Sequence, residues 1–131
     1  MIVLDTHVLI WWIGGGRKLS ARARREMKNA MPESPAEVSA ISALEIATAV
    51  RRGRLDLGMP VEEWFADLNK LPEVRFRPVS AAMAQLAGSF DPSAPADPAD
   101  RLIAATAIVL GATLITADDK LRGFPPVRTA W

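Results

Sequence analysis

The sequence of 131 residues contains no cysteine, no tyrosine and a single histidine, His7. Without cysteine the chain has no disulfide, no thiolate nucleophile and no cysteine-bound zinc or iron–sulfur site, which is common for cytosolic proteins. One histidine excludes a zinc site built from several histidines, and the lack of tyrosine excludes a tyrosine acid or nucleophile. The remaining candidates for chemistry are carboxylates, hydroxyls and basic side chains.

The sequence also lacks a long hydrophobic run. Its longest uncharged stretch, residues 102–117, is shorter than the roughly 20 residues of a membrane-spanning helix, and Gly111 interrupts it. Residues 1–5 have no basic region and reach an acid at once, so we expect no signal peptide. With 50% apolar and 24% charged residues, the composition predicts one compact domain over residues 1–131, cytoplasmic and without a membrane partner.

Charge is nearly balanced at a net +1, but it is unevenly distributed. Residues 17–28 and 51–54 are strongly basic, whereas residues 56–73 are mainly acidic. A local basic patch can bind a polyanion even when the net charge is near zero, and a solvated helix face is the alternative for each run. The candidate phosphate contacts are Arg22, Arg25 and Lys28.

Short apolar runs alternate with helical patterns along the chain, which predicts an α/β fold with a mostly parallel sheet. Ligands on such sheets bind outside the carboxyl ends of the strands. The predicted strands cover residues 2–4, 38–41, 74–77, 113–116 and 127–129. The predicted helices cover residues 6–13, 20–31, 42–53, 61–71, 80–89 and 98–111, with a single helical turn at 118–122.

Acidic residues follow these strands at the edge where a ligand is expected. They are Asp5 after the first strand, Glu45 in the first turn of the next helix, Asp97 and Asp100 at the start of the long helix, and Asp118 after the 113–116 strand. Taken singly, each suits a helix N-terminus, where an acid stabilises the helix dipole by about 0.3–1 kcal/mol. Glu45 also forms a predicted capping box with Ser42.

As a set, these acids indicate a metal site. Carboxylates on neighbouring strands repel one another and raise one another's pKa values, and a bound cation compensates for that repulsion. A cluster of carboxylate oxygens without histidine or cysteine suits Mg²⁺ or Mn²⁺. Such an ion lowers the pKa of a bound water and neutralises charge on an attacked phosphoryl group. Together with the basic clusters, the acids predict a metal-dependent nuclease.

Four motifs carry a resemblance to a known family: IVLDTHVLIWW at 2–12, SALEI at 42–46, DPADRLIAATAIVLGATLITAD at 97–118, and DKL at 119–121. Together they resemble PIN-domain ribonucleases, and within that family the VapC toxins of bacterial and archaeal toxin–antitoxin pairs. The resemblance runs nearly end to end. Its most specific parts are DTHVLIWW and the DRLIAATA helix followed by LITAD, because their order, spacing and secondary structure all agree.

The resemblance implies a three-layer α/β/α fold with a four- to five-stranded sheet, and cleavage of single-stranded RNA with Mg²⁺ or Mn²⁺. It implies products with 5′-phosphate and 3′-hydroxyl ends, and it makes Arg22, Arg25 and Lys28 candidate RNA contacts. It also implies a cognate antitoxin and a homodimer. The implied catalytic residues are Asp5, Glu45, Asp100 and Asp118, with Asp5, Asp100 and Asp118 as metal ligands. Asp97 is implied as a cap or outer ligand, and Thr116 as a hydroxyl that orients water or substrate.

Neighbouring residues receive structural interpretations. We interpret His7 as a packed histidine, and Trp11 and Trp12 as core and subunit contacts and not as base-stacking platforms. Arg101 is expected to pair with a nearby acid. The apolar first helix predicts an exposed patch shared with Trp64 and Phe65, suited to a second copy or to an antitoxin.

Two alternatives remain beside the nuclease. A receiver domain has similar length and an acidic pocket, but it needs paired acids after the first strand and an aspartate after the middle strand. Here only Asp5 follows the first strand, and residues 78–80 contain no acid. A phosphatase with an Asp-x-Asp nucleophile is excluded because the pair would be Asp5 and His7. A catalytically inactive PIN-like binding module is the second alternative, and only an assay separates it from the enzyme.

Overall fold

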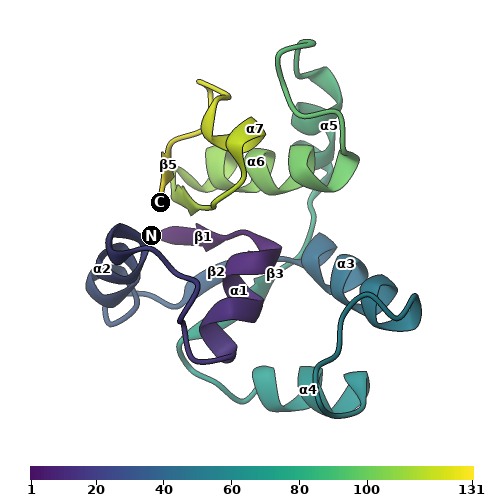
Figure 1. The fold of residues 1–131 in the computed structure, drawn as a ribbon. Helices are drawn as coiled ribbons and strands as arrows, with labels where there is room; N and C mark the ends of the chain where they lie inside the picture. Colours follow the sequence, from purple (N-terminus) through teal and green to yellow (C-terminus); the bar gives the residue numbers. More distant parts are fainter.

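A computed structural model describes residues 1–131 of the chain (Figure 1). The strands are β1 (Ile2–Leu4), β2 (Ala36–Ser39), β3 (Val74–Arg77), β4 (Thr113–Ile115) and β5 (Thr129–Ala130). The helices are α1 (Thr6–Ile13), α2 (Ala21–Ala30), α3 (Ala40–Arg51), α4 (Val61–Leu68), α5 (Ala81–Ser89), α6 (Pro98–Leu110) and α7 (Asp119–Arg122). No helix is long and apolar enough to cross a membrane.

The five strands form one parallel sheet in the order β3-β2-β1-β4-β5. Helices cover both faces, with α5, α6 and α7 above the sheet in Figure 1 and α1, α2 and α4 below it. The predicted three-layer α/β/α fold is therefore confirmed, with every strand pair parallel. A receiver domain has the strand order 2-1-3-4-5, so the observed order excludes that alternative.

The central strand β1 is buried on both sides, which explains its unbroken apolar sequence. Ile2 and Leu4 belong to the core cluster on the α1–α2–α4 face. Val3 belongs to the cluster on the α6–α7 face, where it packs with residues such as Ile103 and Leu121. Because β2 and β4 pair with β1 in parallel, the carboxyl ends of all three strands meet at one edge.

Most predicted helix starts are confirmed by the side chains that cap them. Ser20, Ser80, Asp97 and Asp118 each accept hydrogen bonds from backbone N–H groups in the first turn of the following helix. Gly111 ends α6 in the left-handed region at φ 63°, a conformation that glycine adopts without steric cost.

The start of α3 differs from the prediction. Its N-cap is Ser39, whose hydroxyl accepts a hydrogen bond from the Ile41 N–H, and β2 ends where the helix begins. Ser42 lies inside the helix, fully buried, so the predicted capping box between Ser42 and Glu45 is wrong. A buried tertiary partner of Ser42, described below, replaces the local cap. The predicted strand over 38–41 is likewise shifted toward Ala36.

The predicted apolar patch is only partly present. Trp64 is buried at 6% exposure and packs edge-on against Phe65, so its predicted exposure is wrong. Val8 and Leu9, on the inner face of α1, are fully buried, whereas Ile13 at the end of the helix is 36% exposed. The helix hides one face in the core, as its amphipathic packing requires.

A buried ion pair links β2 to the edge strand β3. The Glu37 side chain has 0% exposure, and its Oε1 accepts hydrogen bonds from both Arg75 and Arg77, the latter at 2.9 Å. Burial raises the pKa of Glu37, but the two guanidinium groups together lower it by more than burial raises it. The pKa of Glu37 therefore lies below its usual value. This ion pair was not anticipated from the sequence.

Candidate metal centre

Acidic side chains gather where β1, β2 and β4 end. Carboxylate oxygens of Glu45, Asp97 and Asp100 all lie within 4.8 Å of one another. Asp5 and Asp118 belong to the same electrostatic cluster, because both charges raise the pKa of Asp100. All four predicted catalytic acids are thus brought together, and Asp97, which caps α6 as predicted, also has a carboxylate oxygen close to Glu45 and Asp100.

Asp5 is held by hydrogen bonds from both sides. The carboxylate is 6% exposed, its Oδ1 accepts a hydrogen bond from the Thr6 N–H at 2.8 Å, and its Oδ2 accepts one from the Thr116 hydroxyl at 2.6 Å. Burial raises the pKa of Asp5 and outweighs these hydrogen bonds, which lower it. A cation beside this fixed carboxylate would favour the ionised form that burial disfavours.

Thr116 connects two of the acids. Its buried hydroxyl donates its only proton to Asp5 and accepts a hydrogen bond from the Asp118 N–H at 3.0 Å. Asp118 in turn accepts hydrogen bonds from the N–H groups of Lys120 and Leu121. The threonine therefore fixes the relative positions of Asp5 and Asp118.

Two further hydroxyls, missed by the sequence analysis, position Glu45. The Thr6 hydroxyl donates to Glu45 Oε1 at 2.6 Å and lies 2.8 Å from the Ser42 hydroxyl. Because Thr6 has one proton and gives it to the carboxylate, Ser42 must be the donor in the second bond. The i, i+3 spacing of Ser42 and Glu45 places both on one helix face, and this was the available sequence signal.

Replacing Thr6 by valine should weaken the site without changing its charge. Valine keeps the shape but removes the proton that holds Glu45 Oε1, and it leaves the buried Ser42 hydroxyl without its acceptor. We expect metal affinity to fall by about 10- to 100-fold, and the cleavage rate to fall with it, as for other residues that orient metal ligands. Titration calorimetry with Mn²⁺ measures the first effect. Thr6→Ser should restore it, and wild-type metal affinity in Thr6→Val would contradict the assignment.

Asp100 has the most strongly raised pKa of the cluster. Burial is the main cause, followed by the charges of Asp97, Asp5, Asp118 and Glu45, and together they raise the pKa of Asp100 to about 7. Burial and neighbouring acids also raise the pKa of Glu45. None of these five acids forms an ion pair, since the salt bridges of the protein involve only Glu37 and Asp119.

The donor set therefore fits a hard divalent cation. Every candidate ligand is a carboxylate oxygen, the ligand type that Mg²⁺ and Mn²⁺ prefer. No salt bridge pairs these acids with a basic side chain; His7 lowers the pKa values of Asp5 and Glu45, but burial and the neighbouring acids outweigh it. Asp5, Asp100 and Asp118 are the predicted ligands, and the geometry adds Glu45 and Asp97 as oxygens within reach.

Arg101 does not pair with an acid, contrary to expectation. Its guanidinium donates to the backbone carbonyl oxygens of Ala87, Pro95 and Phe90 at 2.9, 3.2 and 2.8 Å. The arginine thereby ties α6 to the loop that ends at Asp97. Its role in the site is indirect, through the position of that loop.

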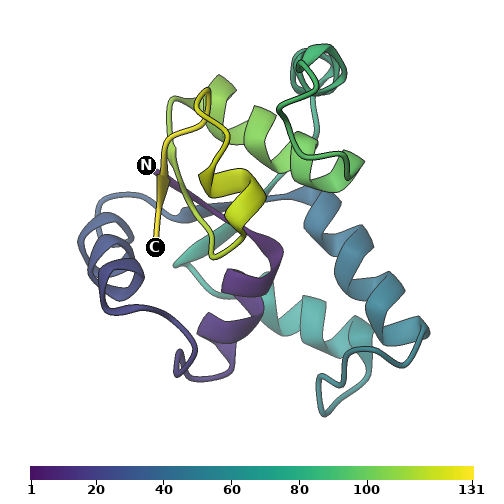
Figure 2. The ribbon, with the colours of Figure 1, turned by 45° about the horizontal axis from the view of Figure 1, so that its top comes forward.

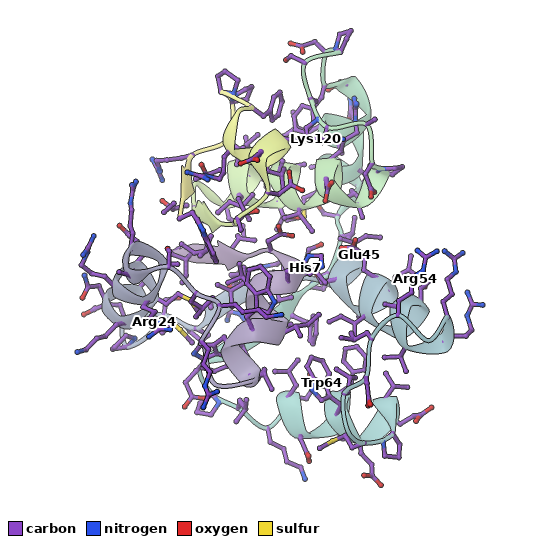
Figure 3. All side chains as sticks on the ribbon, in the orientation of Figure 1. His7, Arg24, Glu45, Arg54, Trp64 and Lys120 are labelled. Atoms are coloured by element: carbon purple, nitrogen blue, oxygen red, sulfur yellow. The ribbon has the colours of Figure 1, made fainter.

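His7 is exposed and not packed, which corrects a second expectation. It lies near Glu45 in Figure 3, and its side chain helps to line an open cavity of about 240 Å³. Asp5, Trp11, Ala117 and Asp118 form the rest of this cavity. Two of the predicted metal ligands therefore share a depression with two aromatic rings.

Comparison with known proteins identifies the family. The PIN domain profile matches residues 2–125. The chain belongs to the PIN domain family. This PIN domain is 36% identical over 132 residues to Ribonuclease VapC22 of Mycobacterium tuberculosis (strain ATCC 25618 / H37Rv), covering 99% of the chain and 98% of that protein. The family predicted from the four motifs is thereby confirmed.

Solved structures agree with the PIN fold. VapBC2 from Rickettsia felis bound to a promoter DNA fragment superposes with a TM-score of 0.72 at 18% identity, covering 99% of this chain and 98% of that one. DNA-bound VapBC from Salmonella typhimurium superposes with a TM-score of 0.69 at 19% identity, covering 98% of this chain and 96% of that one. At these identities the likeness supports the fold of this PIN domain and nothing finer.

Proposed function

We propose that this PIN domain is a metal-dependent endoribonuclease toxin of a toxin–antitoxin pair. One observation carries the proposal: five carboxylates without a salt-bridge partner converge at the carboxyl edge of the sheet, and burial and mutual repulsion raise the pKa values of three of them. Similarity over the whole chain to a protein named Ribonuclease VapC22 supports the same activity.

The chain's own residues supply binding and orientation for hydrolysis of a phosphodiester bond. Bound Mg²⁺ or Mn²⁺ would supply Lewis acidity and lower the pKa of an attacking water. Asp5, Asp100 and Asp118 would hold the ion, with Thr116 fixing two of them. Thr6 holds Glu45 through Oε1, which leaves Oε2 free to face the ion or the water.

The decisive experiment incubates the purified chain with single-stranded RNA and Mn²⁺ or Mg²⁺, against the same mixture with EDTA. We expect internal cleavage with metal, none with EDTA, and recovery when metal is added in excess. Asp5→Asn, purified in parallel, controls for contaminating ribonucleases. Metal binding without cleavage would instead establish the inactive binding module.

We further propose a cytoplasmic antitoxin partner and a homodimer. Solved relatives are described as toxin–antitoxin complexes, among them one from Klebsiella pneumoniae with a TM-score of 0.64. The exposed Ile13 and the partly exposed Trp12 at the end of α1 are apolar surface available for such contacts. Sedimentation of the purified chain at micromolar concentration tests the dimer.

The basic residues of α2 remain a proposed RNA contact, at a distance from the acids. Arg22, Arg25 and Lys28 are exposed, and Figures 1 and 2 place α2 on the opposite side of the molecule from α3, the helix that contains Glu45. Neutralising all three should weaken binding of every RNA alike. The slope of the logarithm of affinity against the logarithm of salt concentration should become less steep by about 0.7 for each lost phosphate contact. An unchanged slope would make these residues an ordinary solvated surface.

A further inference from the structure

Two aromatic side chains face the cavity that Asp5 and Asp118 line. His7 and Trp11 are four residues apart in α1, so they lie on one face of the helix, one turn apart. Asp5 caps the same helix, which brings its carboxylate to the foot of that face. One predicted metal ligand and the aromatic wall therefore belong to one short segment.

The rings are accessible and are not packed flat against each other. His7 is exposed and Trp11 is half-buried. Their centroids are 5.8 Å apart with a tilt of 42°, so neither ring covers the face of the other. The Trp131 ring also packs near Trp11, with a centroid distance of 5.7 Å and a tilt of 53°. Trp11 packs against the core through part of its surface, as expected, whereas the expectation that His7 is packed is wrong.

A cation borders the same wall. The Lys18 ammonium lies 5.9 Å from the centroid of the Trp11 ring, and Lys18 is exposed without an ion-pair partner. An aromatic face with a neighbouring cation matches a nucleotide, which presents a flat base beside a charged phosphate. Single-stranded RNA is recognised by unpaired bases that stack on Trp, His, Tyr or Phe side chains.

The dimensions favour one base over a protein segment. At about 240 Å³ the cavity is smaller than the roughly 300–1,000 Å³ of sites for drug-sized ligands. The larger groove of the protein, about 510 Å³ and lined by Trp12 and Met27, contains none of the acids of the metal centre. A docked helix or strand would need a longer surface than the His7–Trp11 wall provides.

We propose that His7 and Trp11 form a stacking subsite for one unpaired nucleobase of the RNA, directly beside the bond that is cleaved. This inference rests on the proposed ribonuclease function and makes it specific. Lys18 contacts the phosphate of the stacked nucleotide. The subsite holds the RNA so that the next phosphate lies over Asp5 and Asp118.

The test is a double-mutant cycle that combines substitution of the aromatic residue with removal of the RNA base. A fluorescein-labelled single-stranded RNA with one mapped cleavage site is compared with versions that carry an abasic nucleotide on either side of that bond. All proteins carry Asp100→Asn, so that the RNA stays intact, and affinity is measured by fluorescence anisotropy. Trp11→Leu should weaken binding of the intact RNA by about 5- to 150-fold, the factor expected for one stacked base.

The abasic RNA distinguishes stacking from general destabilisation. Removal of the stacked base should weaken binding to the tryptophan protein by a similar factor, and it should have no further effect in Trp11→Leu. Trp11→Phe should retain most of the affinity. His7→Ala, at an exposed position where folding is not at risk, should show the same coupling to the same base at smaller amplitude.

Val109→Ala is the control, because Val109 is exposed on α6 and lines neither this cavity nor the larger groove, and it should leave both affinities unchanged. Equal weakening of intact and abasic RNA by Trp11→Leu, or no weakening by either aromatic variant, would overturn the subsite. Altered self-association with unchanged RNA affinity would overturn it in favour of a subunit contact. If the wild-type chain fails to cleave RNA with Mn²⁺, the proposed function itself fails, and the subsite with it.

Discussion

Asp100→Asn is expected to abolish RNA cleavage and to make the metal-free protein more stable. The substitution removes a carboxylate from the predicted ligand set, and we expect a loss of more than about 100-fold in rate with Mg²⁺. It also removes a charge that the fold holds at a cost, since burial and four acidic neighbours raise the pKa of Asp100 to about 7. A purely structural cap would give the opposite stability change.

The stability gain should depend on pH. The Asp100 carboxyl binds its proton more tightly in the folded chain than in the unfolded one, so deprotonation favours unfolding. The free energy of unfolding of the metal-free wild type should therefore fall as the pH rises from about 4 to about 7. At pH 8 in EDTA, Asp100→Asn should be about 1 to 2 kcal/mol more stable, a value reduced for partial solvent exposure.

Urea unfolding at pH 4.5 and pH 8, together with the cleavage assay, measures both effects. Asp119→Asn is the matched control, because Asp119 is exposed, adjoins Asp118 in sequence and contacts only Arg122 at 3.7 Å. It should retain full activity and stability. A variant at Asp100 that cleaves at the wild-type rate, or that is unfolded at neutral pH, would rule out the metal-ligand role.

The double substitution Arg75→Met, Arg77→Met should strongly destabilise the protein. It leaves the fully buried Glu37 carboxylate without a counter-charge. Breaking a buried pair in this way costs about 3–5 kcal/mol, and we expect about 3 kcal/mol because water reaches both arginines. Thermal unfolding at pH 7 measures the change.

The pH dependence and a triple variant test the cause. In the wild type the arginines hold the pKa of Glu37 below its usual value. The ion pair therefore stabilises the fold fully at a pH above the usual pKa of glutamate. This stabilisation is lost as the pH falls through the pKa of Glu37 in the folded protein. In the double variant, acid should instead recover stability by protonating Glu37. Adding Glu37→Met should recover most of the loss at pH 7, because an apolar replacement of a whole buried pair is often neutral. No recovery would mean that lost packing, and not charge, is responsible.

Local chemistry determined much of this protein from its sequence alone. The caps at Ser20, Ser80, Asp97 and Asp118 each bond to a backbone N–H within three residues, so their patterns predict helix starts without any tertiary information. The alternation of apolar runs and helices predicts a parallel sheet, and a parallel sheet places the residues that follow its strands at one edge. The clustering of the four acids proposed as catalytic could be predicted for that reason.

Only the tertiary structure decided which buried polar side chains contact each other. Thr6 and Ser42 meet across 36 residues, and Glu37 meets Arg75 across 38, so no local pattern reveals either contact. Their geometry depends on which strands neighbour each other and on how each helix rotates over the sheet. That rotation is set by packing of the whole core, and it also places His7 and one side of Trp11 at the acidic cavity while Trp11 still packs against the core.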